Sequence, residues 1–180
     1  MKFTETELKG AFVIEMVPRV DERGFFARTF CAHEFSENGL KSNMVQSNLS
    51  KSTLKNTLRG MHYQVNGAEE AKLVRCTRGK IRDVIIDIRP ESATYCKHFS
   101  IELTDENYKM LYVPEGFAHG FITLTDNCEV FYQVSNFYTP NSEKGIRWND
   151  TLFNIEWPTK NPIISEKDNA HPDFIPVKKA

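Results

Sequence analysis

The heptapeptide LRGMHYQ at residues 58–64 places an arginine, a histidine, a tyrosine and a glutamine close together, next to a glycine. The guanidinium of Arg59 can form paired hydrogen bonds with a phosphate group. The imidazole of His62 titrates near neutral pH, so it can accept and release a proton. Gly60 permits a close approach of the backbone. The heptapeptide therefore predicts either an ordinary strand or the floor of a site that binds an anion and moves a proton.

A second histidine lies in VPEGFAHGF, where P-x-G-x-x-H ends at His119. This spacing resembles the second half of the cupin signature, in which the histidine binds a metal. A complete cupin metal site also needs H-x-H on an earlier strand, and this chain has only His62, followed by Gln64. The remaining histidines have no partner at metal-ligand spacing: His33, His98 and His171. We therefore expect no catalytic metal, and acid–base chemistry instead.

Composition limits the class of protein. A chain of 180 residues suits one domain, residues 1–180, and 40% apolar residues with 13 phenylalanines predict a large aromatic core. The net charge of −1 makes nucleic acid a poor candidate partner, whereas a few arginines suffice for a small anion. The four cysteines form no C-x-x-C pair, and the N-terminus has no apolar signal segment. We expect a cytoplasmic protein that does not bind membranes.

Short β-rich segments separated by glycine, proline, asparagine and aspartate predict the elements that position these residues. The expected strands are 11–17, 24–30, 44–50, 58–64, 72–78, 80–88, 97–104, 109–114, 120–125 and 129–135. One helix is expected at 31–40, with Gly39 as its C-cap. This pattern predicts an all-β fold, a cupin-like jelly-roll barrel with a few short helices, whose mouth holds one ligand.

The strand expected at 80–88 has apolar residues on both faces. In IRDVIIDI, isoleucine and aspartate alternate on one face, and Arg82, Val84, Ile86 and Ile88 occupy the other. A strand with one solvated face would alternate between apolar and polar residues. We therefore expect this strand to be buried on both sides or to line a cavity.

Seven motifs, in order from about Gly10 to Asp168, resemble the dTDP-4-dehydrorhamnose 3,5-epimerase family. They are DERGFF, LRGMHYQ, KLVRCTRG, VPEGFAHGF, GIRWND, IEWP and SEKD. The resemblance implies a cupin-like jelly roll without metal or cofactor, usually a homodimer. It implies a nucleotide diphosphate 4-keto-6-deoxy sugar as substrate, inverted at C3 and C5.

The C4 ketone of such a sugar makes the protons at C3 and C5 acidic, so inversion needs a base, an acid and a charge that stabilises the enolate. The resemblance implies that His62 is the base and that Asp168 pairs with it, as in the Ser-His-Asp arrangement. It likewise implies that Tyr132 is the acid on the opposite face. Lys72 is expected beside the ketone oxygen, where an ammonium group stabilises developing negative charge.

The resemblance also assigns substrate-binding positions. Arg59 and Arg23 are expected to hold the diphosphate, with Arg23 reaching the nucleotide bound in a partner subunit. The other positions implied to bind substrate are Gln46, Ser47, Asn48, His119, Glu143 and Lys167. Arg28 is also expected to bind substrate. It stands where the family often has a glutamate, and this change of charge leaves the accepted nucleotide open.

The same residues also fit other functions and structural roles. Taken singly, each of these residues also has a structural interpretation, as a core histidine, an inward aromatic or a solvated charge. A mono-epimerase that inverts only C3 or only C5 fits the same residues. A metal-dependent cupin enzyme and a non-catalytic sugar-nucleotide binding module are the other hypotheses. The set of base, acid and lysine favours the epimerase, because a binding module needs no acid and base together.

Overall fold

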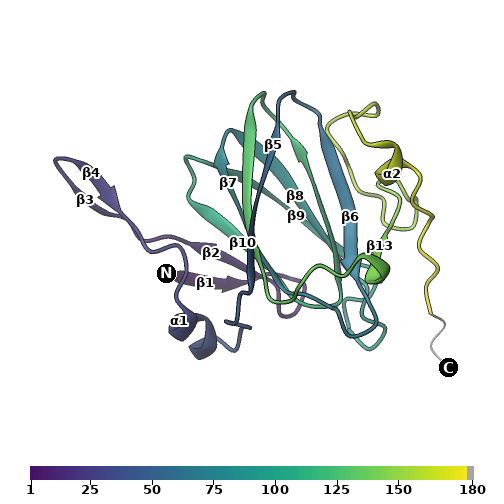
Figure 1. Cartoon of the computed structure of the whole chain (residues 1–180), viewed down its shortest axis with the longest axis horizontal. Coiled ribbons are helices and arrows are strands. Elements are labelled where there is room, and N and C mark those ends of the chain that lie inside the picture. Colours follow the sequence, from purple (N-terminus) through teal and green to yellow (C-terminus); the bar gives the residue numbers. More distant parts are fainter. Residues whose placement is uncertain (178–180) are drawn as a thin grey trace.

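Two antiparallel β-sheets pack face to face in the computed structural model, which describes residues 1–177 (Figure 1). One sheet has the strand order β1-β2-β10-β7-β12-β5 and the other has the order β13-β6-β11-β8-β9. A separate hairpin pairs β3 with β4. This arrangement confirms the predicted all-β jelly-roll class.

The bounds of the elements follow the chain in order. The strands are β1 (Lys2–Glu5), β2 (Phe12–Glu15), β3 (Arg19–Asp21), β4 (Gly24–Phe26), β5 (Gln46–Ser52), β6 (Leu58–Gln64), β7 (Lys72–Arg78), β8 (Lys80–Asp87), β9 (His98–Thr104), β10 (Lys109–Val113), β11 (Phe117–Thr123), β12 (Cys128–Val134) and β13 (Glu143–Gly145). The helices are α1 (Ala32–Glu37), the 3₁₀ turn η1 (Pro140–Ser142) and α2 (Glu166–Asn169).

Most predicted strands are confirmed, and β6 and β7 have the predicted bounds. The segment 24–30 is a strand only as far as Phe26, and β1, β3 and β13 were not predicted. Helix α1 is shorter than expected, and its C-cap is Asn38, so the prediction of Gly39 was wrong by one position. Gly39 follows with a φ of +72°, the left-handed conformation that favours glycine after a helix.

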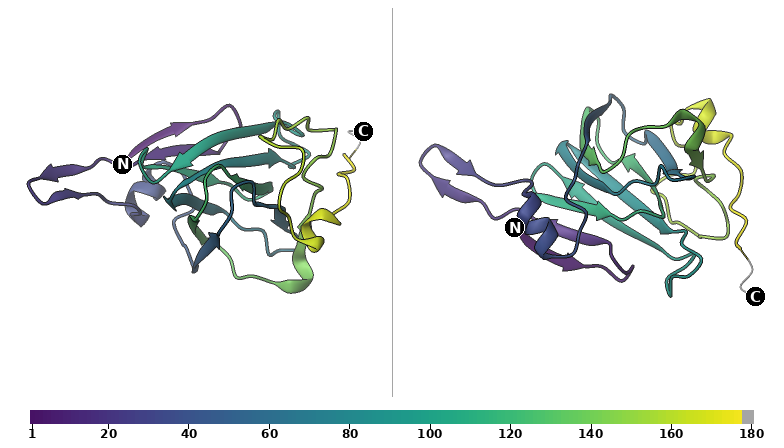
Figure 2. Two further views of the ribbon diagram at one scale, coloured as in Figure 1. Left: turned by 90° about the horizontal axis from the view of Figure 1, so that it is seen from above. Right: turned by 60° about the horizontal axis from the view of Figure 1, so that its bottom comes forward.

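The core lies between the two sheets. Buried side chains of β7, β10 and β12 meet those of β8, β9 and β11 there. Strand β8 is buried on both sides, as predicted: Ile81 and Ile85 face the core between the sheets, whereas Val84 and Ile86 pack under the C-terminal segment with Phe153. The C-terminal segment with α2 therefore covers the outer face of the five-stranded sheet (Figures 1 and 2).

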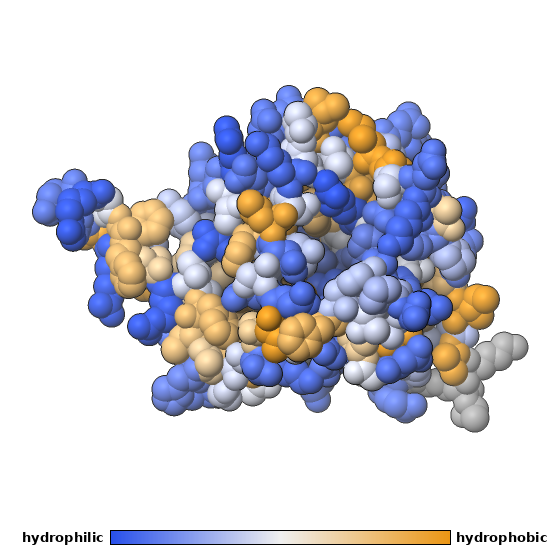
Figure 3. All heavy atoms as spheres, viewed as in Figure 1, coloured by the Kyte–Doolittle hydropathy of each residue, from blue (hydrophilic) through white to orange (hydrophobic). Residues whose placement is uncertain are grey.

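The β3–β4 hairpin projects away from the two sheets (Figures 1 and 2). Its apolar side chains are exposed, with Val20 at 78% and Phe26 at 68% relative exposure. Hydrophobic residues otherwise form small separate areas on the face seen in Figure 3. Within residues 1–177, no helix is both long and apolar enough to cross a membrane.

Strands β6 and β11 approach each other closely at two glycines. Gly60 has a φ of +112°, and a Cβ atom there would lie 2.6 Å from Gly120 Cα and 2.7 Å from the carbonyl oxygen of His119. Both contacts are with backbone, which cannot rotate away. This close approach brings the backbone of β6, and with it His62, against His119 in the paired strand.

We predict that Gly60→Ala destabilises the fold more than its positive φ alone requires. The added methyl group overlaps β11, and overpacking costs about 1–3 kcal/mol beyond the ~1–2 kcal/mol of a left-handed conformation. Gly67→Ala is the matched control, because Gly67 has a φ of +82° but no atom of residues 1–177, apart from its chain neighbours, within 4 Å of its Cβ position. Urea unfolding measures both variants, and equal losses of unfolding free energy would contradict the packing argument.

Candidate active site

A cavity of about 590 Å³ opens between the two sheets. Strands β5, β7 and β12 line it from the six-stranded sheet, and β6, β11 and β13 line it from the other. Its lining residues are Gln46, Asn48, Ser50, Arg59, His62, Tyr63, Gln64, Glu70, Lys72, His119, Gly120, Phe121, Tyr132, Val134, Tyr138, Glu143, Ser165 and Asp168. The predicted base, acid, carboxylate and lysine therefore face one cavity.

His62 and Asp168 form the predicted pair. The Nε2 atom of His62 lies 2.9 Å from Oδ1 of Asp168, and the backbone N–H of Gly60 donates to Oδ2 at 3.0 Å. Burial alone would raise the pKa of Asp168, but the hydrogen bonds from His62 and Gly60 outweigh it and lower this pKa to about 2. The carboxylate is therefore ionised at neutral pH and can only accept, so Nε2 of His62 carries the proton. Nδ1 is then the nitrogen that is left to act as a base.

The short helix α2 positions the Asp168 carboxylate next to β6. Helix α2 begins after Ser165, whose hydroxyl accepts the backbone N–H of Asp168 at 3.1 Å. Serine is a favoured N-cap because its oxygen satisfies an otherwise free N–H group of the first turn. The cap therefore fixes the turn that aims the carboxylate at the strand.

His119 is held by a second carboxylate. Its Nε2 lies 2.7 Å from Oδ1 of Asp83 on β8, and both side chains are buried. Within residues 1–177, the other oxygen of Asp83 has no hydrogen-bond partner. The bond to Asp83 fixes the orientation of the His119 ring, which lines the cavity.

Lys72 and Tyr132 lie on the wall opposite His62, on β7 and β12. The ammonium group of Lys72 is buried and lies 3.2 Å from Oε1 of Glu70. Burial, and then the negative charge of Glu70, raises the pKa of Tyr132, while Arg59 has the opposite effect. The phenol therefore keeps its proton at neutral pH and can donate it.

The mouth of the cavity is polar. Arg59 donates to the Ser52 hydroxyl at 3.3 Å and to the Lys51 carbonyl at 3.1 Å. Lys167 forms an ion pair with Glu143, which also accepts from the Tyr138 hydroxyl at 3.2 Å. Burial would raise the pKa of Glu143, but its bond to Lys167 lowers it. These charged groups can bind a polar or anionic ligand.

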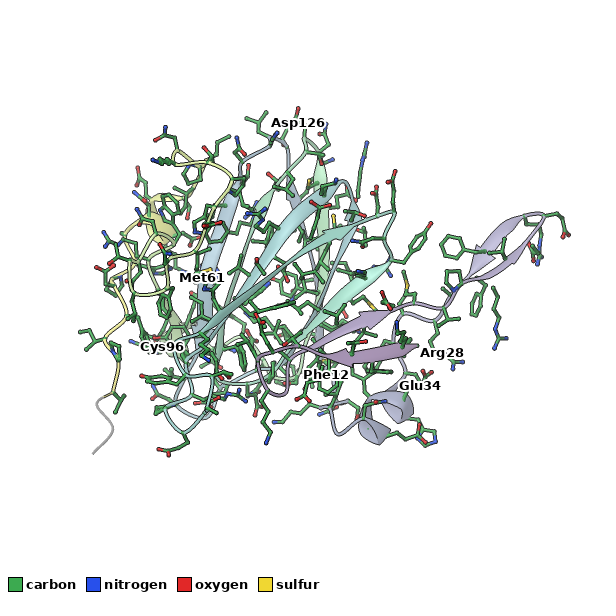
Figure 4. All side chains as sticks on the ribbon, turned by 180° about the vertical axis from the view of Figure 1, so that it is seen from behind. Phe12, Arg28, Glu34, Met61, Cys96 and Asp126 are labelled. Carbon is green, nitrogen blue, oxygen red and sulfur yellow. The ribbon has the colours of Figure 1, made fainter. Side chains whose placement is uncertain are left out.

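Four predicted binding residues are not among those that line the cavity: Ser47, Arg23, Arg28, and Lys167, which pairs with the lining residue Glu143. Ser47 occupies the exposed face of β5, because side chains alternate along a strand and Gln46 and Asn48 point inward. Its role in substrate binding stays a prediction. Arg23 is paired with Asp21 at 2.6 Å on the projecting hairpin. Arg28 is paired with Glu34 at 3.2 Å, far from Met61 of β6 (Figure 4).

The structure corrects the expectation for His171. Its Nε2 lies 3.7 Å from Oδ1 of Asp168, and its ring meets that of His62 edge to face, with centroids 5.7 Å apart. Burial, followed by the positive charge of His62, lowers the pKa of His171, so this imidazole is neutral. Sequence spacing could not reveal the cluster, because His62 lies 106 residues from Asp168.

Sequence reasoning missed several other residues of the site. Asp83 had a usable signal, because a carboxylate in the apolar strand 80–88 must find a buried partner. Glu70 and Tyr138 lie in loops beside predicted site residues and carried no such signal. Gln64, which replaces the second histidine of a cupin metal motif, accepts the Thr139 N–H at 2.8 Å and donates to the Ala68 carbonyl at 3.0 Å. It joins two loops at the cavity edge.

We predict that Asp168→Asn lowers stability in a pH-dependent way. Because the folded pKa of Asp168, about 2, lies below its unfolded value, ionisation stabilises the fold above about pH 4, and this stabilisation is lost as the pH falls toward 2. The variant should lose ~2 kcal/mol of unfolding free energy at pH 7. Urea unfolding at several pH values should show that the difference in unfolding free energy between the variant and the wild type decreases below about pH 5. A difference in unfolding free energy that does not change with pH would contradict an electrostatic origin of the stabilisation.

Comparison with known proteins places this geometry in a family. Residues 5–175 match the family model described as dTDP-4-dehydrorhamnose 3,5-epimerase. The dTDP-4-dehydrorhamnose 3,5-epimerase of Shigella flexneri is 46% identical over 175 residues, which cover 97% of each chain.

Solved structures agree in fold. The dTDP-4-dehydrorhamnose 3,5-epimerase of Elizabethkingia anophelis superposes with a TM-score of 0.94 at 40% identity, over 97% of this chain and 96% of the other. The dTDP-6-deoxy-D-glucose-3,5-epimerase of Legionella pneumophila, solved with dTDP-4-keto-L-rhamnose, has a TM-score of 0.90 at 34% identity over 99% of both chains. The chain belongs to the dTDP-4-dehydrorhamnose 3,5-epimerase family.

Proposed function

We propose that this protein is an isomerase that converts dTDP-4-dehydro-6-deoxy-D-glucose into dTDP-4-dehydro-L-rhamnose. The observation that carries the proposal is the placement of His62 and Tyr132 on facing sheets across one cavity, on β6 and β12. Inversion of a carbon requires removal of a proton from one face and delivery to the other, and this pair supplies both sides. The family to which the chain belongs supports the same reaction.

In the proposed mechanism, Nδ1 of His62 removes the proton from the carbon next to the C4 ketone. The Asp168 carboxylate holds the other ring nitrogen and stabilises the imidazolium that forms. Lys72 stabilises the negative charge that develops on the ketone oxygen, an effect worth ~3–4 kcal/mol per donor. Tyr132 then returns a proton on the opposite face of the enolate. These residues carry out the reaction without a cofactor.

Binding of the nucleotide diphosphate is proposed to use Arg59 from the same chain. His119 and Glu143 line the cavity, and Lys167 pairs with Glu143. We propose that these residues bind the hydroxyl groups of the sugar and the oxygens of the phosphates. Gln46 and Asn48 add neutral donors and acceptors from β5. The chain as a whole, residues 1–180, would serve as one epimerase domain.

We further propose a homodimer in which the β3–β4 hairpin reaches a second copy. The exposed apolar side chains Val20, Phe25 and Phe26 favour burial against a partner. Such contact would allow Arg23, and Arg28 at the base of the hairpin, to approach the partner's nucleotide.

We propose that the protein works in the cytoplasm. Cysteines without a disulfide suit a reducing compartment, and those of this chain are Cys31, Cys76, Cys96 and Cys128.

The assigned base and acid are tested by solvent exchange. We predict that His62→Asn reduces incorporation of solvent deuterium at C3 and C5 of the 4-keto sugar by roughly 10²–10⁴-fold. We predict that Tyr132→Phe still exchanges deuterium but forms little epimer, because the base remains and the opposite-face acid is lost. NMR in heavy water reads both positions. His98→Asn, on β9 outside the cavity, is the matched control. Full exchange by His62→Asn would refute the base, and exchange at one carbon only would identify a mono-epimerase.

The dimer is tested separately. We predict that the protein sediments as a dimer, and that Arg23→Ala raises KM by ~10-fold or more with little change in kcat, because one charged contact to phosphate is lost. Arg78→Ala, at an exposed position at the end of β7, should leave KM unchanged. A fully active monomer, or an unchanged KM in the Arg23 variant, would contradict the shared site.

A further inference from the structure

His171 is a buried polar side chain that the proposed mechanism does not use. Its side chain is only 12% exposed, and its Nε2 has no hydrogen-bond partner in the described residues 1–177. A buried imidazole nitrogen without a partner is costly, because it has lost its hydrogen bonds to water. The position of this nitrogen therefore requires an explanation.

Three elements hold the His171 ring in place. A methyl group at Gly145 of β13 would overlap the ring atoms, including Nε2, so only glycine leaves room for it. The next residue, Pro172, accepts the backbone N–H of Arg147 at 2.9 Å, and Arg147 pairs with Asp173 at 2.7 Å. On the other side, Asp168 belongs to the turn α2. The imidazole is thus fixed against the strand that pairs with His62.

The result is a cluster of three metal-ligand types. One donor atom each from His62, Asp168 and His171 lies within 4.8 Å of the other two. The two distances to Oδ1 of Asp168 are 2.9 Å from His62 and 3.7 Å from His171. Two ligands of a tetrahedral ion with bonds of about 2.1 Å lie ~3.4 Å apart, and the two measured distances bracket this value.

We propose that His62, Asp168 and His171 bind one Zn²⁺ or similar divalent transition-metal ion, and that this ion inhibits the enzyme. Two imidazoles and a carboxylate are the donor set that such ions prefer. The ion takes the place of the proton between His62 and Asp168. The His62 side chain is 31% exposed, so water or an anion can reach the ion and complete its shell.

Inhibition follows from the chemistry of imidazole and rests on the proposed function. A neutral imidazole that binds metal through Nε2 carries its proton on Nδ1. It then has no lone pair with which to remove a proton from the sugar. Metal binding and proton abstraction by His62 are therefore mutually exclusive.

Direct titration tests the site without any substrate. Untagged, metal-free protein is titrated with Zn²⁺ by calorimetry and with Co²⁺ by visible absorption. We expect one ion per chain, with the intense d–d bands of a four- or five-coordinate Co²⁺ ion. His171→Phe keeps an aromatic ring and removes both nitrogens, and it should weaken Zn²⁺ binding at least ~10-fold, since even indirect partners of a ligand contribute ~10–100-fold. His33→Ala, on the exposed face of α1, should bind as the wild type does.

Absence of stoichiometric binding, or equal affinity in His171→Phe and the wild type, would overturn the site and leave His171 as a packing residue. The second arm measures solvent deuterium exchange into the 4-keto sugar nucleotide. Stoichiometric Zn²⁺ should stop exchange, EDTA should restore it, and His171→Phe should need at least ~10-fold more Zn²⁺. Exchange that continues in zinc-saturated protein would overturn the inhibition. Metal-free protein with no exchange would instead contradict the proposed function, while the titration still decides the site.

Discussion

The site depends on one buried negative charge, the carboxylate of Asp168. Such a charge is tolerated inside a protein only when donors surround it, and here they come from His62 and Gly60 of β6. These bonds tie the C-terminal turn to a strand in the middle of the chain. They also decide which nitrogen of His62 is free to react, so the same contact that holds the chain end in place sets the chemistry.

The rest of the cavity repeats this arrangement. Three further groups at the cavity have a carboxylate beside them: His119 has Asp83, Lys72 has Glu70 and Lys167 has Glu143. Each acid restricts the movement of its partner before a ligand arrives. Preorganised charges of this kind stabilise a transition state without reorganisation during the reaction. The two rigid sheets keep the pairs in register across the cavity.

The sequence predicts the strands better than the site's supporting contacts. Alternation and turn residues place β6 to β12 within a few positions, because a half-buried strand leaves a period-2 pattern. The strands β1, β3 and β13 are short and were missed, and the turn α2 is too short to leave a helical period. The resemblance to a family identified His62, Lys72, Tyr132 and Asp168, which the cavity brings together.

Residues whose placement depends on tertiary structure escaped prediction. Asp83 contacts His119 and His171 approaches His62 only when segments distant in the sequence meet. Ser47 stays a prediction, since its neighbours on β5 take the inward positions. Arg23 stays a prediction, because its expected ligand belongs to a second copy of the chain.

The Asp168 carboxylate keeps the proton on Nε2 of His62 and leaves Nδ1 as the base. Nitrogen-15 NMR of the His62 ring in metal-free protein measures this directly, because the two ring nitrogens have different shifts when protonated and unprotonated. We expect the neutral ring to be protonated at Nε2, and we expect Asp168→Ala to remove this preference. A neutral His62 ring protonated at Nδ1 in the wild type would contradict it.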